Sequence, residues 1–303
     1  MSKIVPATSS DTVPNRRGRQ PSFVSVVMPA RNARRTLGAQ LEALRGQDYP
    51  GPWELVVADN GSTDGTADLA SDWPRTLPIR VVDASARRGA SFARNRGWRS
   101  ARGDLIAFCD ADDVVSPRWL SRLTEAAQEN DLVGGPYEFS RLNAVQGQPW
   151  WDGASLPVKM SFLPYIVGGN LAVWADVLTA LGGFNEAYTG AEDVELSWRA
   201  QLSSLRLGFA PDAVVHCRYR TRWADNAFKA YRIGYQKPHL YRDFRAHGVR
   251  RSRSPRFPLR VGWLLMRTPA LAMTPARRSA WVRSACEELG RLAGCARYGV
   301  LYL

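Results

Sequence analysis

The stretch of the sequence best suited to chemistry is FCDADD at 108–113, where an apolar run ends in three carboxylates within four residues. Carboxylates this close repel one another and raise each other's pKa unless a cation compensates them. Mg²⁺ and Mn²⁺ are hard cations that prefer oxygen ligands. The stretch therefore predicts a divalent-cation site, and the simpler alternative is an acidic turn that caps the next helix.

A second polar stretch, DNGSTDGT at 59–66, is rich in residues that form turns and helix caps. Its backbone amides predict a concave surface for an anion or a nucleobase, and Asp59 could accept hydrogen bonds from a base edge. Segment 87–94 places arginines around Gly89 and ends at Arg94, and guanidinium groups suit bidentate contacts to phosphate. The alternatives are an ordinary turn at 59–66 and a solvated helix face for the arginines.

Glu192 and Asp193 open a helix-like segment, GAEDVELSWR at 190–199. The helix dipole favours acids at a helix N-terminus, which is one explanation for the pair. The other explanation is that an acid here acts as a general base beside the cation. His216 is one of three histidines and ends a strand-like run, so it is either a structural residue or a further metal ligand in its neutral form.

Apolar strand-like runs alternate with helix-like stretches over the first 140 residues. The predicted strands are residues 23–29, 53–59, 79–84, 104–110 and 131–139, with helices between them. Beyond residue 140 we expect a Trp- and Pro-rich loop, a strand and helix after the glycines at 168 and 169, a helix after residue 190, and two short strands ending at His216. This alternation indicates an α/β fold with a mostly parallel, doubly wound sheet.

Polar residues follow the carboxyl ends of three predicted strands, at Asn32, Asp59 and Asp110. Ligands of open parallel sheets bind beyond this edge, because the loops that follow the strands meet there. Loops from distant parts of the chain are therefore expected to converge on one crevice. This arrangement favours a ligand site over a set of unrelated turns.

The chain has 303 residues, enough for one large domain or two modest ones. Its four cysteines are widely spaced and form no CxxC pair, which argues against a structural zinc site or a disulfide framework and for a reducing compartment. Residues 1–21 lack the apolar core of a signal peptide and are rich in Ser, Thr, Pro and Arg. We predict that they form a disordered segment.

Positive charge is concentrated at the end of the chain. Residues 1–215 carry 22 Lys and Arg against 24 Asp and Glu, a net charge of −2, whereas residues 216–303 carry 19 against 4, a net charge of +15; together they give +13. Such asymmetry predicts an anionic partner. An anionic membrane surface is favoured over nucleic acid, because residues 1–215 have no basic surplus.

The most apolar part of this basic extension is residues 257–273, which contain Arg260 and Arg267. The segment is shorter than the roughly 20 residues of a membrane-spanning helix, and charges inside a bilayer are costly. An interfacial segment is expected instead, with arginines that reach anionic headgroups. The alternative is a helical subdomain that packs on the rest of the chain or forms a homodimer.

Seven motifs follow one another between about residues 22 and 220: VVMPARNA at 26–33, DNGSTDGT at 59–66, RRGASFARNRG at 87–97, FCDADD at 108–113, GGN at 168–170, GGFNE at 182–186 and GAEDVELSWR at 190–199. None is specific alone, but in this order they resemble the family 2 glycosyltransferases with the GT-A (nucleotide-diphospho-sugar transferase) fold. The QxxRW motif of processive members is absent. The chain has an Arg-Trp pair at 222 and 223, but Tyr219 stands three residues before Arg222, where the motif requires Gln. The resemblance therefore implies the addition of a single sugar.

The resemblance also implies a catalytic domain at 22–220, a basic helical extension at 221–303, and roles for the matching residues. Pro29, Ala30, Asn32, Asp59, Gly89, Arg94 and Asp110 would bind the nucleotide sugar, Asp112 and His216 would hold Mg²⁺ or Mn²⁺, Asp193 would be the catalytic base, and Glu192, Gly169, Asn170 and Trp151 would line the acceptor side.

The implied reaction is metal-dependent, inverting transfer of one sugar from a nucleoside-diphosphate sugar, expected to be uridine-based, to a hydroxyl of a glycan or a lipid-linked acceptor. We expect such an enzyme in the cytoplasm, attached peripherally to the inner face of the cell membrane. One alternative is a sugar-phosphate nucleotidyltransferase, although PARNARRT at 29–36 lacks its glycine-rich loop. Another is a nucleotide-sugar-binding protein without catalysis, against which the acids at 110, 112 and 193 speak.

Overall fold

The computed structural model describes residues 18–74, 76–143, 151–219, 222–251, 262 and 275–302. Its strands are β1 (Val24–Ala30), β2 (Trp53–Asp59), β3 (Ile79–Asp83), β4 (Leu105–Cys109), β5 (Val114–Val115), β6 (Leu132–Gly134), β7 (Tyr137–Glu138), β8 (Val158–Lys159), β9 (Leu163–Pro164), β10 (Asn170–Trp174), β11 (Leu207–Phe209) and β12 (Val215–His216). Its helices are α1 (Arg34–Arg45), α2 (Thr66–Ser71), α3 (Ala90–Ser100), α4 (Trp119–Ala127), α5 (Ala175–Leu181), α6 (Glu192–Leu202), α7 (Trp223–Phe244), the 3₁₀ helix η1 (Arg245–His247) and α9 (Pro275–Tyr298).

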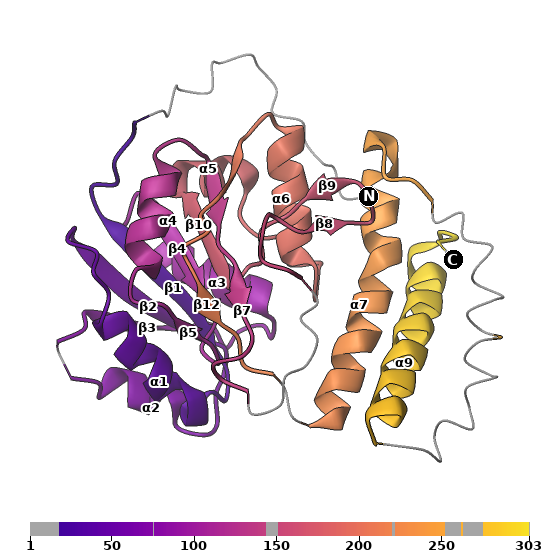
Figure 1. Ribbon diagram of the computed structural model, residues 1–303, viewed down its shortest axis with the longest axis horizontal. Helices are drawn as coiled ribbons and strands as arrows, with labels where there is room; N and C mark the ends of the chain where they lie inside the picture. The colour runs from indigo at the N-terminus through magenta and orange to yellow at the C-terminus, as the bar shows by residue number, and fades with distance from the viewer. Residues whose placement is uncertain are drawn as a thin grey trace.

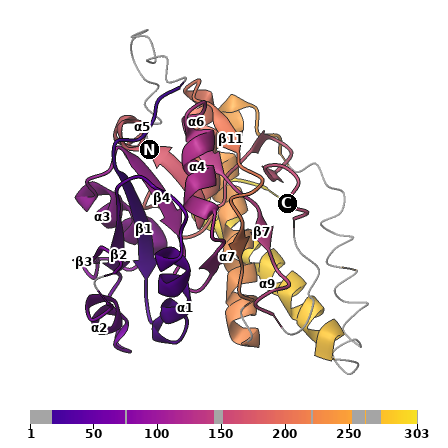
Figure 2. The ribbon, with the colours of Figure 1, turned by 60° about the vertical axis from the view of Figure 1, so that its left-hand side comes forward.

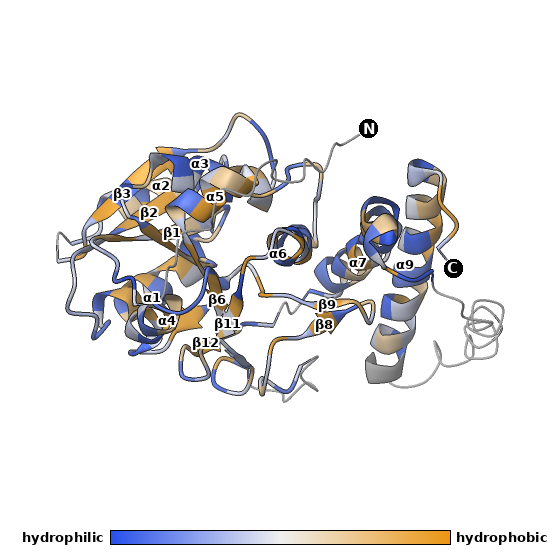
Figure 3. Cartoon of the chain, turned by 90° about the horizontal axis from the view of Figure 1, so that it is seen from above, coloured by the Kyte–Doolittle hydropathy of each residue, from blue (hydrophilic) through white to orange (hydrophobic). Residues whose placement is uncertain are grey.

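A seven-stranded sheet with the order β11-β6-β10-β4-β1-β2-β3 forms the centre of the molecule (Figure 1). Strand β10 runs antiparallel to both of its neighbours, and the other neighbouring strands pair in parallel. Helices α3 and α5 cover one face, and α1 and α4 cover the other (Figures 2 and 3). The predicted α/β fold with a mostly parallel, doubly wound sheet is confirmed.

The central strands read as continuous apolar sequences because helices cover both faces of the sheet. Strand β4, LIAFC, is completely buried, and α1 turns Leu37, Leu41 and Leu44 onto the sheet at helical spacing. On the opposite face, a Cβ on Gly97 of α3 would collide with the side chain of Val27. Glycine therefore lets α3 lie close against β1.

The single strand expected at 131–139 is instead two strands in two sheets. Strand β6 belongs to the central sheet, whereas β7 pairs with β12 in a small sheet of order β5-β12-β7. Residues 135 and 136 cause the break. A Cβ on Gly135 would collide with the carbonyl of Ala213, and Pro136 has no amide hydrogen to continue the ladder.

Helix α7 packs against α6, so the basic extension shares a core with the preceding fold. Leu240 and Phe244 of α7 lie in one buried cluster with Val194 and Trp198 of α6. Figures 1 and 3 both place α6 between the central sheet and the pair formed by α7 and α9. Helix α7 therefore packs on the preceding fold through α6, and the division of the chain at residue 221 stays a prediction.

Helices α7 and α9 lie side by side along much of their length (Figure 1). Their contact is made by glycines, since a Cβ on Gly234 would collide with the carbonyl of Glu287, and one on Gly290 would collide with that of Tyr231. Glycine lets two helix backbones approach this closely because it has no side chain. The backbones of α7 and α9 therefore lie in direct contact at these glycines.

Two sequence-based expectations concern residues outside the described part of the chain. These are the interfacial segment at 257–273, of which only residue 262 is described, and most of the disordered segment at 1–21. Among the described helices, none combines the length and the apolar content needed to cross a bilayer.

Replacing Gly290 with Ala should separate α9 from α7, because the new methyl group has no room against Tyr231. We expect faster hydrogen exchange across residues 275–298, with exchange in β1 and β4 unchanged. Gly38→Ala is the matched control, since Gly38 is also in a helix but its Cβ would meet Trp73 at an ordinary 3.8 Å. That change should stabilise the protein by up to about 1 kcal/mol. Equal protection of α9 in Gly290→Ala and in the unmodified protein would contradict the packing described.

Candidate functional site

The carboxyl ends of β1, β2 and β4 bring their following loops together at one edge of the sheet. Asn32 lies two residues past β1 in the left-handed region, with φ 50°. Its backbone amide donates to Ser62 Oγ at 3.0 Å, and its Oδ1 accepts from the Thr63 amide at 2.8 Å. The loops after β1 and β2 are thus tied together, beside the carboxylates that follow β4.

Three carboxylates cluster after β4. Asp110, Asp112 and Asp113 each offer a ligand oxygen, and these oxygens lie within 4.8 Å of one another. Asp113 is buried and accepts a hydrogen bond from the Arg218 amide at 2.8 Å, while Asp112 is exposed. The sequence analysis counted Asp113 among the three carboxylates but gave it no individual role, and the structure places it in the cluster as the third member.

The cluster has the electrostatics of a cation site. Burial raises the pKa of Asp113 to about 8, and the charges of Asp112 and Asp110 contribute to this rise. A divalent cation would relieve that repulsion, and three carboxylates are ligands that Mg²⁺ and Mn²⁺ prefer. The residues present therefore fit the metal that the sequence predicted.

Arg94 is a buried cation that joins the loop after β4 to the start of α6. Its Nη2 donates to Asp110 Oδ1 at 2.8 Å, and its Nη1 donates to Glu192 Oε1 at 2.9 Å. The Arg94 residue is 5% exposed. Its two ion pairs hold it inside the protein, and its expected contact with the nucleotide stays a prediction. Glu192, expected on the acceptor side, is buried as the partner of Arg94.

Asp193 lies in the first turn of α6, directly after Glu192. Its Oδ2 accepts a hydrogen bond from the Gly168 amide at 3.1 Å, and its Oδ1 accepts from the Val194 amide at 2.8 Å. Arg94 thereby links the carboxylate cluster, through Glu192, to the candidate base Asp193.

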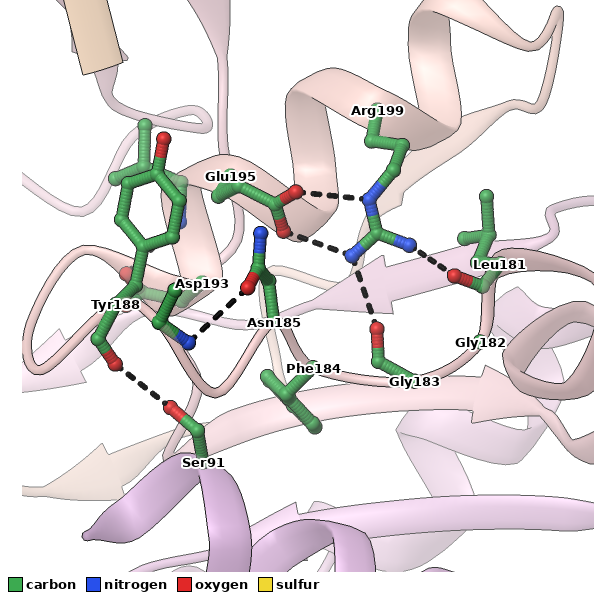
Figure 4. A network of polar contacts seen from close by, with 12 residues as sticks. Ser91, Leu181, Gly182, Gly183, Phe184, Asn185, Tyr188, Asp193, Glu195 and Arg199 are labelled. Atoms are coloured by element: carbon green, nitrogen blue, oxygen red, sulfur yellow. Dashed lines mark hydrogen bonds and ion pairs between the residues drawn. The ribbon is translucent and has the colours of Figure 1, made fainter. Parts of the chain in front are cut away.

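The loop that leads into α6 is held at several points (Figure 4). Arg199 forms an ion pair with Glu195 at 2.7 Å and also donates to the carbonyl of Gly183 at 2.9 Å. Ser91 of α3 donates to the carbonyl of Tyr188 at 3.0 Å. These contacts fix the backbone on both sides of the loop, and so they fix the position at which Asp193 enters the helix.

The expected nucleotide-binding residues line the edge formed by β1, β2 and α3. Asp59 Oδ2 accepts from the Ser62 amide at 3.1 Å, while its buried Oδ1 has no hydrogen-bond partner among the described residues. Pro29 and Ala30 end β1 opposite Ala58 and Asp59. Gly89 precedes α3 with φ 140°, and a Cβ there would meet open space. The contact between Asp59 and a nucleobase stays a prediction.

His216 lies on β12, outside the carboxylate cluster found among the described residues. Its Nδ1 lies 2.8 Å from Glu138 Oε2, and its Nε2 lies 3.0 Å from Arg141 Nη1. A guanidinium only donates, so Nε2 accepts and Nδ1 carries the proton. Both ring nitrogens are therefore engaged, and His216 could ligate a metal only if the ion replaced Arg141.

Two of the expected acceptor-side residues face the protein instead. Asn170 is fully buried; it accepts from Trp119 Nε1 at 2.8 Å and donates to the carbonyls of Pro136 and Ala213 at 3.0 and 2.9 Å. Trp151 packs edge-on against Phe209, with ring centroids 6.2 Å apart. Asn170 thus ties the central sheet to the small sheet, and its complete burial leaves no surface that a sugar acceptor could contact.

Gly169, expected on the acceptor side, lies next to Asp110 of the carboxylate cluster, and its place has a steric reason. A Cβ there would come within 2.5 Å of Asp110 Oδ2 and 2.7 Å of the Tyr137 hydroxyl. Tyr137, Lys159 and Tyr165 were not singled out in the sequence. Burial lowers the pKa of Lys159 and raises that of Tyr165, and the charge of Asp193 acts on both groups.

A family model, that of "Glycosyl transferase family 2", matches residues 25–160 of the chain. Glycosyltransferase AglE from Haloferax volcanii is 31% identical over 219 residues, which cover 70% of this chain and 72% of AglE. The UDP-Glc:alpha-D-GlcNAc-diphosphoundecaprenol beta-1,3-glucosyltransferase WfgD from Escherichia coli is 31% identical over 202 residues, or 65% of this chain and 77% of WfgD.

Among solved structures, the chain resembles the mannosyltransferase PcManGT from Pyrobaculum calidifontis in complex with GDP-Man and Mn²⁺. The TM-score is 0.59 at 20% identity, and the alignment covers 94% of this chain and 89% of PcManGT. At this identity the likeness concerns the fold, and it extends over the helices that follow the central sheet.

Proposed function

The chain belongs to glycosyl transferase family 2 and is a glycosyltransferase with the GT-A fold, and we propose from this premise that it transfers one sugar from a nucleoside-diphosphate sugar to an acceptor hydroxyl with inversion. The observation that carries the proposal is the link through Arg94. One buried guanidinium bonds both Asp110, in the carboxylate cluster, and Glu192, the residue before Asp193. A cation-binding group and a candidate base are thereby joined.

We assign the donor to the edge where β1, β2 and α3 meet. Asp59 Oδ1, which lacks a partner among the described residues, would accept a hydrogen bond from the base, and Asn32 shapes the adjoining loop. Pro29 and Ala30 end β1 at this edge, and a Cβ on Gly89 would meet open space. The donor's base is proposed to be uracil; WfgD is named for UDP-Glc and PcManGT was solved with GDP-Man, so both uridine and guanosine donors belong in a test.

Asp112 is proposed as the direct ligand of Mg²⁺ or Mn²⁺, with Asp110 and Asp113 completing the carboxylate cluster. When bound, the ion neutralises negative charge that builds up on the departing diphosphate. Asp110 is held on its other side by Arg94, so its free oxygen keeps one direction. Asp112 is the exposed member of the cluster.

Asp193 is proposed as the general base. Its carboxylate takes the proton of the acceptor hydroxyl, whose oxygen forms a bond to the anomeric carbon while the bond from that carbon to the diphosphate oxygen breaks. Attack opposite the departing group inverts the anomeric centre. The Gly168 amide holds Oδ2 of Asp193 and the Val194 amide holds Oδ1, which fixes the orientation of the carboxylate. Such assistance is typically worth about 10²–10⁴-fold in rate.

The acceptor is proposed to be a glycan or a lipid-linked molecule at the inner face of the cell membrane. Support comes from the first turns of α7, where Trp223 is 72% exposed and Phe228 is 61% exposed. Exposed Arg222 and Lys229 flank them, and this combination of aromatic and cationic side chains suits an anionic membrane surface. WfgD, a relative of the chain, is named for a lipid-linked acceptor.

A thermal-shift panel of UDP-Glc, UDP-GlcNAc, UDP-Gal and GDP-Man tests the donor and the metal together. We expect at least one of them to raise the Tm only when Mn²⁺ is present, since a ligand at 100 times its Kd adds about 2.7 kcal/mol of stability. Asp112→Ala should abolish the Mn²⁺-dependent shift. Asp176→Ala is the control, because Asp176 follows the antiparallel β10 and lies at the opposite sheet edge. A shift that is independent of Mn²⁺, or intact in Asp112→Ala, would refute the metal assignment.

Asp193→Asn should lower the transfer rate by about 10²–10⁴-fold while donor binding stays within about twofold. Asparagine keeps an oxygen that can accept from the Gly168 amide, so the change removes the base and leaves the local hydrogen bond in place. Transfer kinetics and the thermal shift with the donor identified above provide the two measurements. Asp176→Asn should behave like the unmodified enzyme. A rate close to normal in Asp193→Asn would mean that another group takes the proton.

A further inference from the structure

Tyr188, on the loop that leads into α6, is held by two side chains of α7. The tyrosine is 1% exposed. Its hydroxyl donates to Asp243 Oδ2 at 2.8 Å. Its ring lies parallel to the imidazole of His239, with ring centroids 3.9 Å apart and an interplanar angle of 4°. Both partners belong to α7, so the loop before the candidate base Asp193 is fastened to the C-terminal extension.

His239 is the middle ring of a three-membered stack. Tyr298, the last residue of α9, covers the other face of the imidazole, with ring centroids 4.1 Å apart and an interplanar angle of 13°. His239 is buried, and its Nε2 lies 3.4 Å from Asp243 Oδ2. The stack of Tyr188, His239 and Tyr298 therefore joins α9, α7 and the loop before α6 through one side chain.

The same loop has further hydrogen bonds on two sides. Gln236 lies three residues before His239, on the same side of α7, and its Nε2 donates to Thr189 Oγ1 at 2.9 Å. From α3, Ser91 donates to the carbonyl of Tyr188 at 3.0 Å (Figure 4). The loop is thus fixed between α3 and α7, with the stack on the side of α7.

The turn that carries Asp193 follows this loop directly. Ala191, two residues before Asp193, lies in the left-handed region with φ 67°. A residue other than glycine keeps such a conformation only where its surroundings enforce it. Val194, directly after Asp193, lies in the same buried cluster as Tyr188 and Leu240 of α7. The backbone on both sides of Asp193 is therefore supported by groups that contact α7.

The position of a general base decides how well it works. The base has to reach the acceptor hydroxyl within hydrogen-bond distance, and a misplacement of about 1 Å can lower a rate by about 10²-fold. The ion pair of Arg94 and Glu192 holds the start of α6 from the side of the carboxylate cluster. The stack holds the loop before the same turn from the side of α7 and α9. Loss of the stack would therefore leave the link to the cluster in place and loosen the turn that carries Asp193.

We propose that Tyr188 and His239 are positioning residues for Asp193, and that the stack they form with Tyr298 sets where the base meets the acceptor hydroxyl. This inference rests on the proposed function, because it takes Asp193 as the base. It gives the C-terminal helices a part in the transfer step itself. Helix α7 supplies the imidazole and the partner of the Tyr188 hydroxyl, and α9 supplies the outer ring of the stack.

His239→Ala removes the middle ring and tests the proposal by steady-state kinetics. We expect kcat to fall by about tenfold to a hundredfold, while the donor KM and the Mn²⁺-dependent thermal shift stay unchanged. His239→Phe keeps an aromatic ring between the two tyrosines and should restore most of the rate. A variant His239→Phe as slow as His239→Ala would overturn the role of the stack.

Tyr231→Ala is the matched control. Tyr231 stacks on Tyr235 within α7, with ring centroids 6.1 Å apart, and it is not a member of the stack on Tyr188. Its loss removes an aromatic contact from the same helix, so we expect a lower Tm with a normal kcat. A fall in kcat equal to that of His239→Ala would show a general effect of α7 packing and would overturn the proposal.

The decisive measurement combines His239→Ala with Asp193→Asn. A residue that acts only through the base has nothing left to position once the base is removed, so His239→Ala should cause no further loss of rate in the Asp193→Asn background. A merely structural role would lower the rate by the same factor in both backgrounds, and that result would overturn the proposal.

Tyr188→Phe repeats the test with a smaller change. It keeps the stacked ring and removes only the hydroxyl that donates to Asp243, so it serves even where His239→Ala does not fold. We expect a smaller fall in kcat, again absent in the Asp193→Asn background. A normal rate in Asp193→Asn alone would refute the base assignment and this inference with it. A slow Asp193→Asn together with normal rates in His239→Ala and Tyr188→Phe would refute the positioning role alone.

Discussion

The site depends on one buried cation. Arg94 bonds Asp110 on the loop after β4 and Glu192 at the start of α6, and little of it reaches solvent. Removing one partner of such a buried pair typically costs about 3–5 kcal/mol, because a charge is left without compensation. Glycines make the arrangement sterically feasible: a Cβ on Gly168 would crowd the Arg94 guanidinium at 3.3 Å, and one on Gly169 would strike Asp110. Charge and close packing together hold the carboxylate cluster and Asp193 at a fixed separation.

The C-terminal helices extend this framework. Helix α7 shares a buried cluster with α6, and the Tyr188 hydroxyl donates to Asp243 at 2.8 Å, so the basic extension supports the loop that carries the candidate base. The excess of positive charge beyond residue 215 therefore bears on the site as well as on the outer surface of the protein. Some of the positive charge beyond residue 215 faces the site, through Arg232, while Trp223 and Phe228 face outward. Helix α7 thereby contributes side chains both to the site and to the outer surface.

Much of the fold could be read from the sequence, because continuous apolar strands and helical spacing report directly on burial. The acids after β4 and at the start of α6 were found because residue type and strand position suffice for that inference. The hydrogen-bond partners of buried polar groups could not be predicted from the sequence, because they come from segments far apart in the chain. Asn170 forms hydrogen bonds with Trp119, Pro136 and Ala213, and no local sequence pattern predicts these contacts. The break at Gly135 and the half-buried Lys159 are likewise set by tertiary neighbours.

The claim that Arg94 couples the two halves of the site is tested most directly by Arg94→Lys, which keeps the charge but replaces the forked guanidinium with a single ammonium. Mn²⁺ affinity, measured by electron paramagnetic resonance of the free ion, and the rate of sugar transfer should be determined on the same folded preparation. The account predicts that Mn²⁺ affinity and transfer rate both fall, because one ammonium cannot hold Asp110 and Glu192 together. A variant that binds Mn²⁺ and transfers sugar as the unmodified enzyme does would contradict it.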